Sequence, residues 1–232
     1  VVALRPKAWK AATGQELPAG AAPGFGALVE QSLAGRLRVG YSNPYISTPA
    51  LDFLHSLLWL SAGHGADGKP LTAVDLGRPA SRDSFALFQQ RLAATTPTYL
   101  EGITLWKRDP ATFDAAVMTH QSYLRLKQEP GFEDLIAVPF GSPQSSPLVA
   151  LPWTTAAERQ VLEQLARFAA TPSMQARARD LDFNSLPEVP GVARPPRASG
   201  EVLEQALRLW KLRKDGGRTV YLQLVIDTSG SM

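Results

Sequence analysis

The chain has 232 residues, of which 44% are hydrophobic, so it is long enough for one large domain or two small ones with a real core. Its 24 basic and 21 acidic residues leave a formal charge of +3, and the basic residues are dispersed, which argues against nucleic-acid binding. The absence of cysteine excludes disulfides, thiolate catalysis and cysteine-based zinc sites. No stretch reaches the length needed to span a bilayer.

Strand-like and helical patterns alternate along most of the chain. Residues 1–4 are apolar and strand-like, residues 36–41 alternate as in a strand, and residues 50–60 have the apolar content of a buried helix. Further strands are expected at 114–120, 134–140 and 148–151, a strand or a loop at 103–106, and further helices at 25–33, 81–94, 121–127, 156–170 and 173–181. This alternation predicts an α/β fold with a mostly parallel sheet flanked by helices.

A polar loop at residues 42–49, with the sequence SNPYISTP, follows the strand expected at 36–41. Thr48 is expected to be the N-cap of the next helix, with Pro49 at the first helical position. A polar loop that joins a strand to a helix amino terminus is a suitable cradle for an anion or a polar ligand. The alternative is a well-capped helix after a turn, without a ligand.

Thr119, His120 and Gln121 lie where the strand expected at 114–120 passes into a helix. His120 has no serine, aspartate or second histidine at a recognisable spacing, so a catalytic or metal-binding role is unsupported. A structural or ligand-facing hydrogen bond is expected for it instead. His64, in the turn-rich run GHGADGKP, is expected to be an exposed loop histidine.

The last third of the chain changes character. Four prolines between residues 186 and 199 predict a semi-rigid linker, and residues 201–214 predict an amphipathic helix. Apolar residues then fill almost every position from 220 to 226, as in a strand buried on both faces of a parallel sheet. Asp227, Ser229 and Ser231 follow directly, and their oxygens suit a hard cation such as Mg²⁺. An ordinary Asx turn is the alternative.

The run VYLQLVIDTSGSM resembles the first segment of the metal-ion-dependent adhesion site in the von Willebrand factor A family. The resemblance implies a Rossmann-like domain in which Asp227, Ser229 and Ser231 hold Mg²⁺, or Mn²⁺ or Ca²⁺, and an acidic side chain of a protein partner completes the coordination. The later Thr and Asp loops of that family and its further strands are absent from this sequence. The chain is therefore expected to be a fragment of a longer protein, and the metal is expected only where the domain is complete.

A second resemblance is to bacterial extracellular solute-binding proteins of the periplasmic binding protein type II kind. It is carried by GYSNPYISTPALDFLHSLL, DAAVMTHQSYLRL and LVALPWTTAAERQVLEQLARFAATPSMQARARDLDF. It implies a hinged module over residues 1–185, with the second lobe nearly complete and the first partial, that closes on a small ligand or anion. Residues 186–200 are then the linker and residues 201–232 the start of the A domain. Matched onto this family, the ligand-facing candidates are Asn43, Ser47, Thr48, Thr119, His120 and Gln121.

The two resemblances together imply a non-enzymatic, extracytoplasmic binding protein, periplasmic or at the cell surface, that couples a ligand-binding module to a protein-interaction domain. Segments outside this sequence could add a membrane association. The alternative is a cytoplasmic cochaperone-like A-domain protein that works with an ATPase and docks through residues 201–214. An enzyme is not expected, because no Ser-His-Asp set, glycosidase-like carboxylate pair or phosphate-binding glycine loop stands out.

Overall fold

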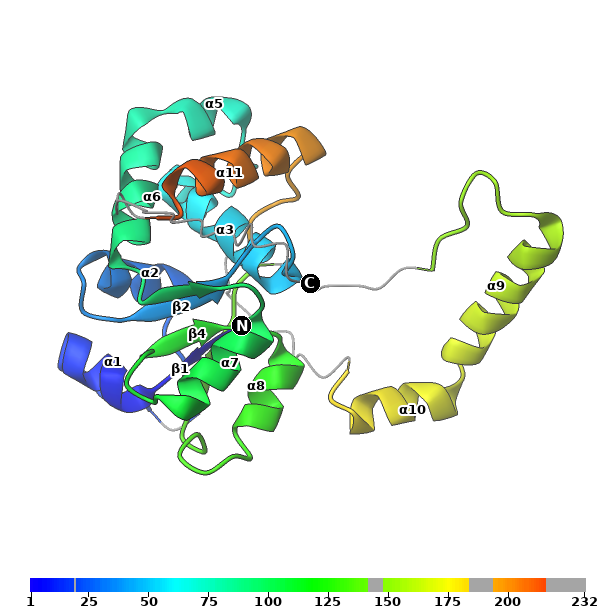
Figure 1. The fold of residues 1–232 in the computed structure, drawn as a ribbon, viewed down its shortest axis with the longest axis horizontal. Helices are drawn as coiled ribbons and strands as arrows, with labels where there is room; N and C mark the ends of the chain where they lie inside the picture. The colour runs from blue at the N-terminus through cyan, green and yellow to red at the C-terminus, as the bar shows by residue number, and fades with distance from the viewer. Residues whose placement is uncertain (19, 142–147, 184–193, 216–232) are drawn as a thin grey trace, which may run out of the picture.

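The computed structural model describes residues 1–18, 20–141, 148–183 and 194–215. Its centre is a five-stranded sheet in the order β3-β2-β4-β1-β5 (Figure 1). The strands are β1 (Val2–Leu4), β2 (Val39–Ser42), β3 (Ala94–Thr96), β4 (Ala115–Val117) and β5 (Ile136–Val138). Since β2 is parallel to β3 and β4 while β1 is antiparallel to β4 and β5, the expected α/β fold is confirmed as a mixed sheet.

The expectation of a mostly parallel sheet is met only in part, because β1 opposes both of its neighbours. Its three residues are all buried. A short run that is apolar at every position predicts a strand buried on both faces of the sheet. The same run suits a parallel and an antiparallel strand, so it does not indicate the direction. The direction of β1 is therefore set by its partners β4 and β5 and could not be read from its residues.

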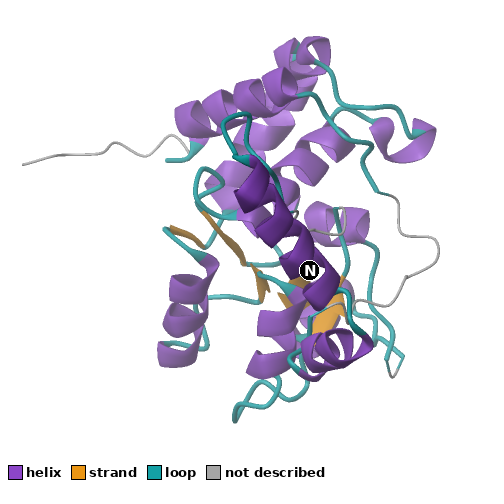
Figure 2. Ribbon diagram, turned by 90° about the vertical axis from the view of Figure 1, so that its right-hand side faces the viewer, coloured by secondary structure: helices purple, strands orange, loops and turns teal. Residues whose placement is uncertain are grey.

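Helices cover both faces of the sheet (Figures 1 and 2). They are α1 (Pro6–Thr13), α2 (Phe25–Leu33), α3 (Thr48–Ser61), α4 (His64–Asp67), α5 (Ala73–Gly77), α6 (Pro79–Arg91), α7 (Tyr99–Arg108), α8 (His120–Leu126), α9 (Ala156–Ala169), α10 (Pro172–Asp180) and α11 (Gly200–Arg213).

Two hydrophobic cores lie on opposite faces of the sheet, because side chains alternate along each strand. Val2 and Leu4 belong to the larger core, together with Phe53 of α3 and side chains of α2, α6 and α11. Ala3 belongs to the smaller core, together with Trp106 of α7 and side chains of α8. The strands are thus covered on both sides.

Three local expectations need correction. Residues 103–106 lie within α7, which begins with a capping box in which the Thr98 hydroxyl accepts from the Glu101 N–H and the Glu101 carboxylate accepts from the Thr98 N–H. Residues 148–151 form no strand and are exposed. The strand β3 was not expected, because Ala94–Thr96 is too short and too polar to stand out.

His64 is not the exposed loop histidine that the sequence predicts, since only 9% of its surface is exposed. Its two ring nitrogens lie 3.0 Å from carboxylate oxygens of Asp67 and Asp75. The hydrogen bond to Asp75, opposed by desolvation and aided by Asp67, raises the pKa of His64 above its ordinary value. The hydrogen bond between His64 and Asp75 therefore ties α4 to α5.

The His64→Gln variant is expected to lose about 1 to 3 kcal/mol of unfolding free energy at pH 5, because Gln cannot bond both carboxylates as a cation. The raised pKa means that the stabilisation is present below the unfolded-state pKa of about 6.5 and is lost as the pH rises through the folded-state value. Urea denaturation at pH 5, 7 and 9 checks this. A difference between the two proteins that grows with pH would contradict it.

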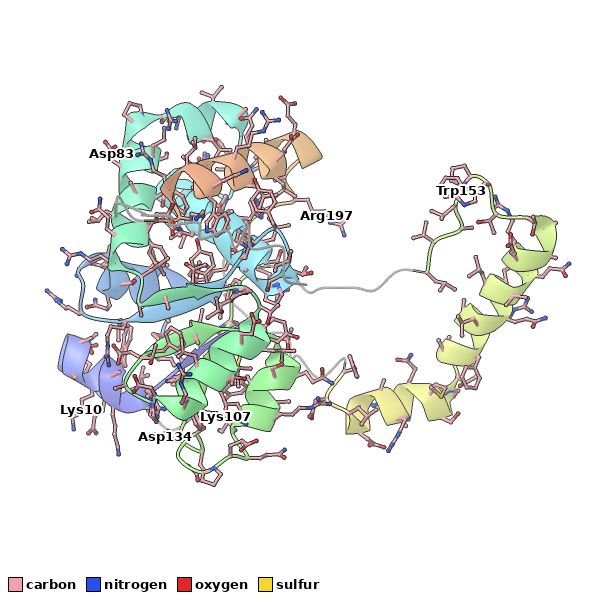
Figure 3. All side chains as sticks on the ribbon, in the orientation of Figure 1. Lys10, Asp83, Lys107, Asp134, Trp153 and Arg197 are labelled. Carbon is pink, nitrogen blue, oxygen red and sulfur yellow. The ribbon has the colours of Figure 1, made fainter. Side chains whose placement is uncertain are left out.

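The segment that holds α9 and α10 lies away from the sheet (Figure 1) and contributes to neither core, since neither helix has a buried residue. Large apolar side chains on it are exposed, among them Trp153, Val161, Leu165 and Phe168 (Figure 3). Among the described residues, none of the helices combines the length and the apolar character that crossing a bilayer demands.

Candidate functional site

The loops that follow β2, β3 and β4 meet at one edge of the sheet. The three strands are adjacent and parallel, so their carboxyl ends lie together. The Asn43 N–H after β2 donates to the Thr96 carbonyl at the end of β3 (2.8 Å), which ties two of the loops to each other. Open α/β sheets bind ligands at this edge. The two sequence-predicted groups of ligand residues, after β2 and after β4, are thus brought to the same edge.

The loop after β2 holds Asn43, Ser47 and Thr48 in fixed positions. The Asn43 side-chain oxygen accepts from the Tyr45 N–H at 2.9 Å, and the Asn43 carbonyl accepts from the Ile46 N–H at 3.2 Å. The Ser42 hydroxyl donates to the buried Ser47 hydroxyl at 2.8 Å. Side chains that are already fixed in the free protein lose little entropy when a ligand binds.

The start of α3 lies one residue earlier than the sequence predicts. Ser47 is the N-cap, Thr48 is the first helical residue and Pro49 the second, so Thr48 is not the cap. The N–H groups of the first two helical residues have no partner inside the helix, so proline, which lacks an N–H, suits either position. Pro49 is therefore as well placed at the second position as at the first. The shift leaves Thr48 exposed and Ser47 buried.

The loop after β4 holds the second group of candidates. Thr119 is the N-cap of α8, where its hydroxyl accepts from the Ser122 N–H at 3.1 Å and donates to the Ser122 hydroxyl. The His120 ring stacks on Tyr123, with centroids 5.7 Å apart. Burial lowers the pKa of His120, and Asp182 opposes this. His120 is therefore biased toward the neutral ring, which can accept as well as donate a hydrogen bond.

Gln121 links this edge to the segment that holds α9 and α10. Its side-chain amide donates to the carbonyl of Leu181, just after α10, at 2.6 Å. Asp182 follows with a φ of 64°, a left-handed conformation that Asp adopts more readily than most residues. The Gln121 amide is therefore already used within the chain, unlike the exposed hydroxyl of Thr48.

A small hollow lies at this edge of the described residues, lined by Tyr41, Ser42, Thr96 and Phe113 among others. Its volume is about 10 Å³, enough for about one water molecule. Ligand sites in proteins are usually far larger. A ligand held by these loops would therefore need a second surface to enclose it.

The predicted metal ligands Asp227, Ser229 and Ser231, with the strand expected at 220–226, lie outside the described residues. Within residues 1–18, 20–141, 148–183 and 194–215, no three acidic or histidine side chains form a group that could hold a metal ion. The expected Mg²⁺, Mn²⁺ or Ca²⁺ site stays a prediction that rests on the sequence alone.

Two neighbours of the candidate residues were missed. Ser42 is the hydroxyl partner of Ser47, and Trp210 packs its ring on Tyr45 within the loop after β2, with centroids 5.9 Å apart. A serine at the end of a strand carries no signal of its own. Trp210 is separated from Tyr45 by most of the chain, so only the three-dimensional fold brings it to this loop.

No family model matches the chain, and no curated protein and no solved structure matches it. The candidate site therefore rests on the geometry and the sequence of this chain.

Proposed function

We propose that this chain belongs to a non-enzymatic binding protein that holds a small polar ligand or an anion against the edge formed by the loops after β2 and β4. One observation carries the proposal: β2 and β4 are adjacent and parallel, so residues more than seventy positions apart in sequence, Asn43 to Thr48 and Thr119 to Gln121, lie at one edge. Hydroxyl, amide and imidazole groups together can donate to and accept from a ligand.

The small volume of the hollow at this edge fits a two-lobe mechanism. A single wall binds weakly, and closure of a second lobe over the ligand buries it and adds contacts. The resemblance to extracellular solute-binding proteins supplies such a lobe and an extracytoplasmic location, and both are part of the proposal.

Thr48→Ala and His120→Ala are each expected to weaken ligand binding about tenfold, because each removes one hydrogen bond to the ligand. A library of small anions and polar solutes is first screened by thermal shift, since a ligand of the folded state raises the melting temperature. The affinity of a hit is then measured by calorimetry.

The matched control is Thr104→Ala, the same change at an exposed threonine in the middle of α7. Equal affinity in the wild type, both site variants and the control would place the ligand elsewhere.

We further propose that Asp227, Ser229 and Ser231 hold Mg²⁺ and that a carboxylate of a protein partner completes its coordination. Asp227→Ala in the full-length protein is expected to abolish Mg²⁺ binding, measured by calorimetry, because it removes the only charged group of the three. Thr228→Ala, at the position between the proposed ligands, is the control and is expected to bind Mg²⁺ as the wild type does. Retained binding in Asp227→Ala would refute the site.

The alternative, a cochaperone-like partner of an ATPase that docks through residues 201–214, is less well supported. The apolar face of α11 is already covered, because Val202, Ala206, Leu209 and Trp210 are buried against the rest of the chain. A helix whose apolar face is covered has little left to offer a partner.

A further inference from the structure

The helix α11 packs on the α/β fold, although its sequence groups it with the C-terminal segment. It contacts α3 and α5 and lies beside them in Figure 1. Its buried residues join the larger core, whereas Leu212 on its outer face is 73% exposed. The predicted linker at 186–200 lies partly outside the described residues, but the helix that follows it is docked.

Trp210 is the residue of α11 that reaches the candidate ligand loop. Its ring is 96% buried, with 4% exposed, and it packs on Tyr45, which lies between Asn43 and Ser47 and is itself 49% exposed. No other ring contact of Tyr45 is found among the described residues. Trp210 therefore contacts a loop residue whose side chain is about half exposed.

The same indole also faces a buried polar group in β2. The Gln89 amide donates to the Tyr41 hydroxyl at 2.6 Å, and burial raises the pKa of Tyr41, against the effect of Gln89 and Trp210. The Trp210 indole N–H acts on the Tyr41 hydroxyl as a hydrogen-bond donor does, although the two groups do not meet in regular hydrogen-bond geometry within the described part of the chain. A poorly aligned hydrogen bond recovers only part of the cost of burying the indole N–H, so the docking of Trp210 is less stable than its burial alone implies.

We propose that Trp210 is a positioning residue for the loop after β2, and that the order of this loop and the docking of α11 are coupled through the contact between Tyr45 and Trp210. An ordered loop keeps Tyr45 against Trp210, and a docked α11 keeps Trp210 against Tyr45, so each of the two states stabilises the other. The ligand-binding role of this loop rests on the proposed function, whereas its coupling to α11 is testable without a ligand.

Amide hydrogen exchange of the 232-residue chain, followed by NMR, tests the coupling in both directions. Trp210→Ala is expected to speed the exchange of the Ile46 and Leu51 amides about 3- to 10-fold, and Tyr45→Ala is expected to speed that of the last turn of α11 by a similar factor, as one aromatic pair allows. The control Leu212→Ala is expected to change neither. The amides of β1 and β4 report global unfolding. They are expected to keep their rates in Tyr45→Ala and Leu212→Ala, whereas Trp210→Ala also speeds them because Trp210 belongs to the larger core.

Trp210→Phe separates positioning from simple loss of packing. Phe keeps an aromatic ring against Tyr45 and removes the poorly bonded indole N–H, so the slow exchange of the loop amides is expected to return. Inorganic phosphate and acetate are then added to the wild type and to Trp210→Ala.

The outcomes separate the inference from the proposed function. Faster exchange of the loop amides in Trp210→Ala and of the α11 amides in Tyr45→Ala supports the coupling. If neither anion shifts the amides of residues 43–48, that separate result counts against the proposed binding of small anions and leaves the coupling unaffected. Exchange that changes in one direction only, or that rises equally in β1 and β4 in the Tyr45→Ala variant, would overturn the coupling whether or not an anion binds.

Discussion

Phe53→Ala is expected to lower the free energy of unfolding by about 3 to 5 kcal/mol, the range typical of a fully buried Phe. Phe53 has 0% of its surface exposed, and its ring lies 5.1 to 5.8 Å, between centroids, from four other rings. These rings belong to Phe25, Tyr41, Phe88 and Phe140. Truncation leaves a cavity at the junction of α2, α3, α6 and the sheet. Urea denaturation measures the loss.

Phe168→Ala is the matched control for this prediction. Phe168 lies on α9 and is 56% exposed, so the same chemical change is expected to cost less than about 0.5 kcal/mol. Comparable losses at the two positions would mean that the core is not centred on Phe53.

Gly40→Ala is expected to lower the free energy of unfolding by about 1 to 3 kcal/mol, because the added methyl group has no room. A Cβ atom at this position would lie 2.3 Å from Cε1 of Phe113, a contact that real structures do not show. Phe113 belongs to the core beneath β2 and β4, so the clash also displaces the strand that leads to Asn43 and Ser47. Thermal unfolding followed by circular dichroism checks the loss.

Gly26→Ala is the opposite case and serves as its control. A Cβ atom there meets nothing within 4 Å, and the residue lies in α2. Alanine is the better helix former, so this variant is expected to gain up to about 1 kcal/mol. A Gly40→Ala protein as stable as wild type would show that Phe113 can move aside at little cost.

The sequence predicts the α/β class because its signals for strands and helices are local. The alternation at residues 36–41 overlaps β2, the apolar run at 115–117 is β4, and the apolar run after Ser47 lies in α3. These signals need no knowledge of distant residues. They place the two polar loops at the ends of strands, but they do not say that the two strands are neighbours.

Features that depend on distant partners could not be predicted. The direction of β1 is set by β4 and β5, and the burial of His64 is set by Asp75, which lies in the next helix. The position of α11 depends on α3 and α5. The sequence pattern of a charged or amphipathic segment is the same whether the segment contacts solvent or packs on another element of the fold.

The ligand role of the six candidate residues stays a prediction, although all six are among the described residues. Two local details differ from expectation: Ser47 rather than Thr48 is at the N-cap position of α3, and the Gln121 amide is bonded to Leu181. Such one-residue shifts at helix ends are common, because several residue types suit the cap. The support from Trp210 could not be foreseen.

The central claim is that the loops after β2 and β4 form one wall of a single ligand site. The measurement that tests it most directly is an NMR titration of the ¹⁵N-labelled chain with a compound from the thermal-shift screen. We predict that the amides of residues 43–48 and 119–121 shift together, with the same midpoint. Shifts in only one of the two loops, different midpoints, or shifts confined to another face of the molecule would contradict the claim.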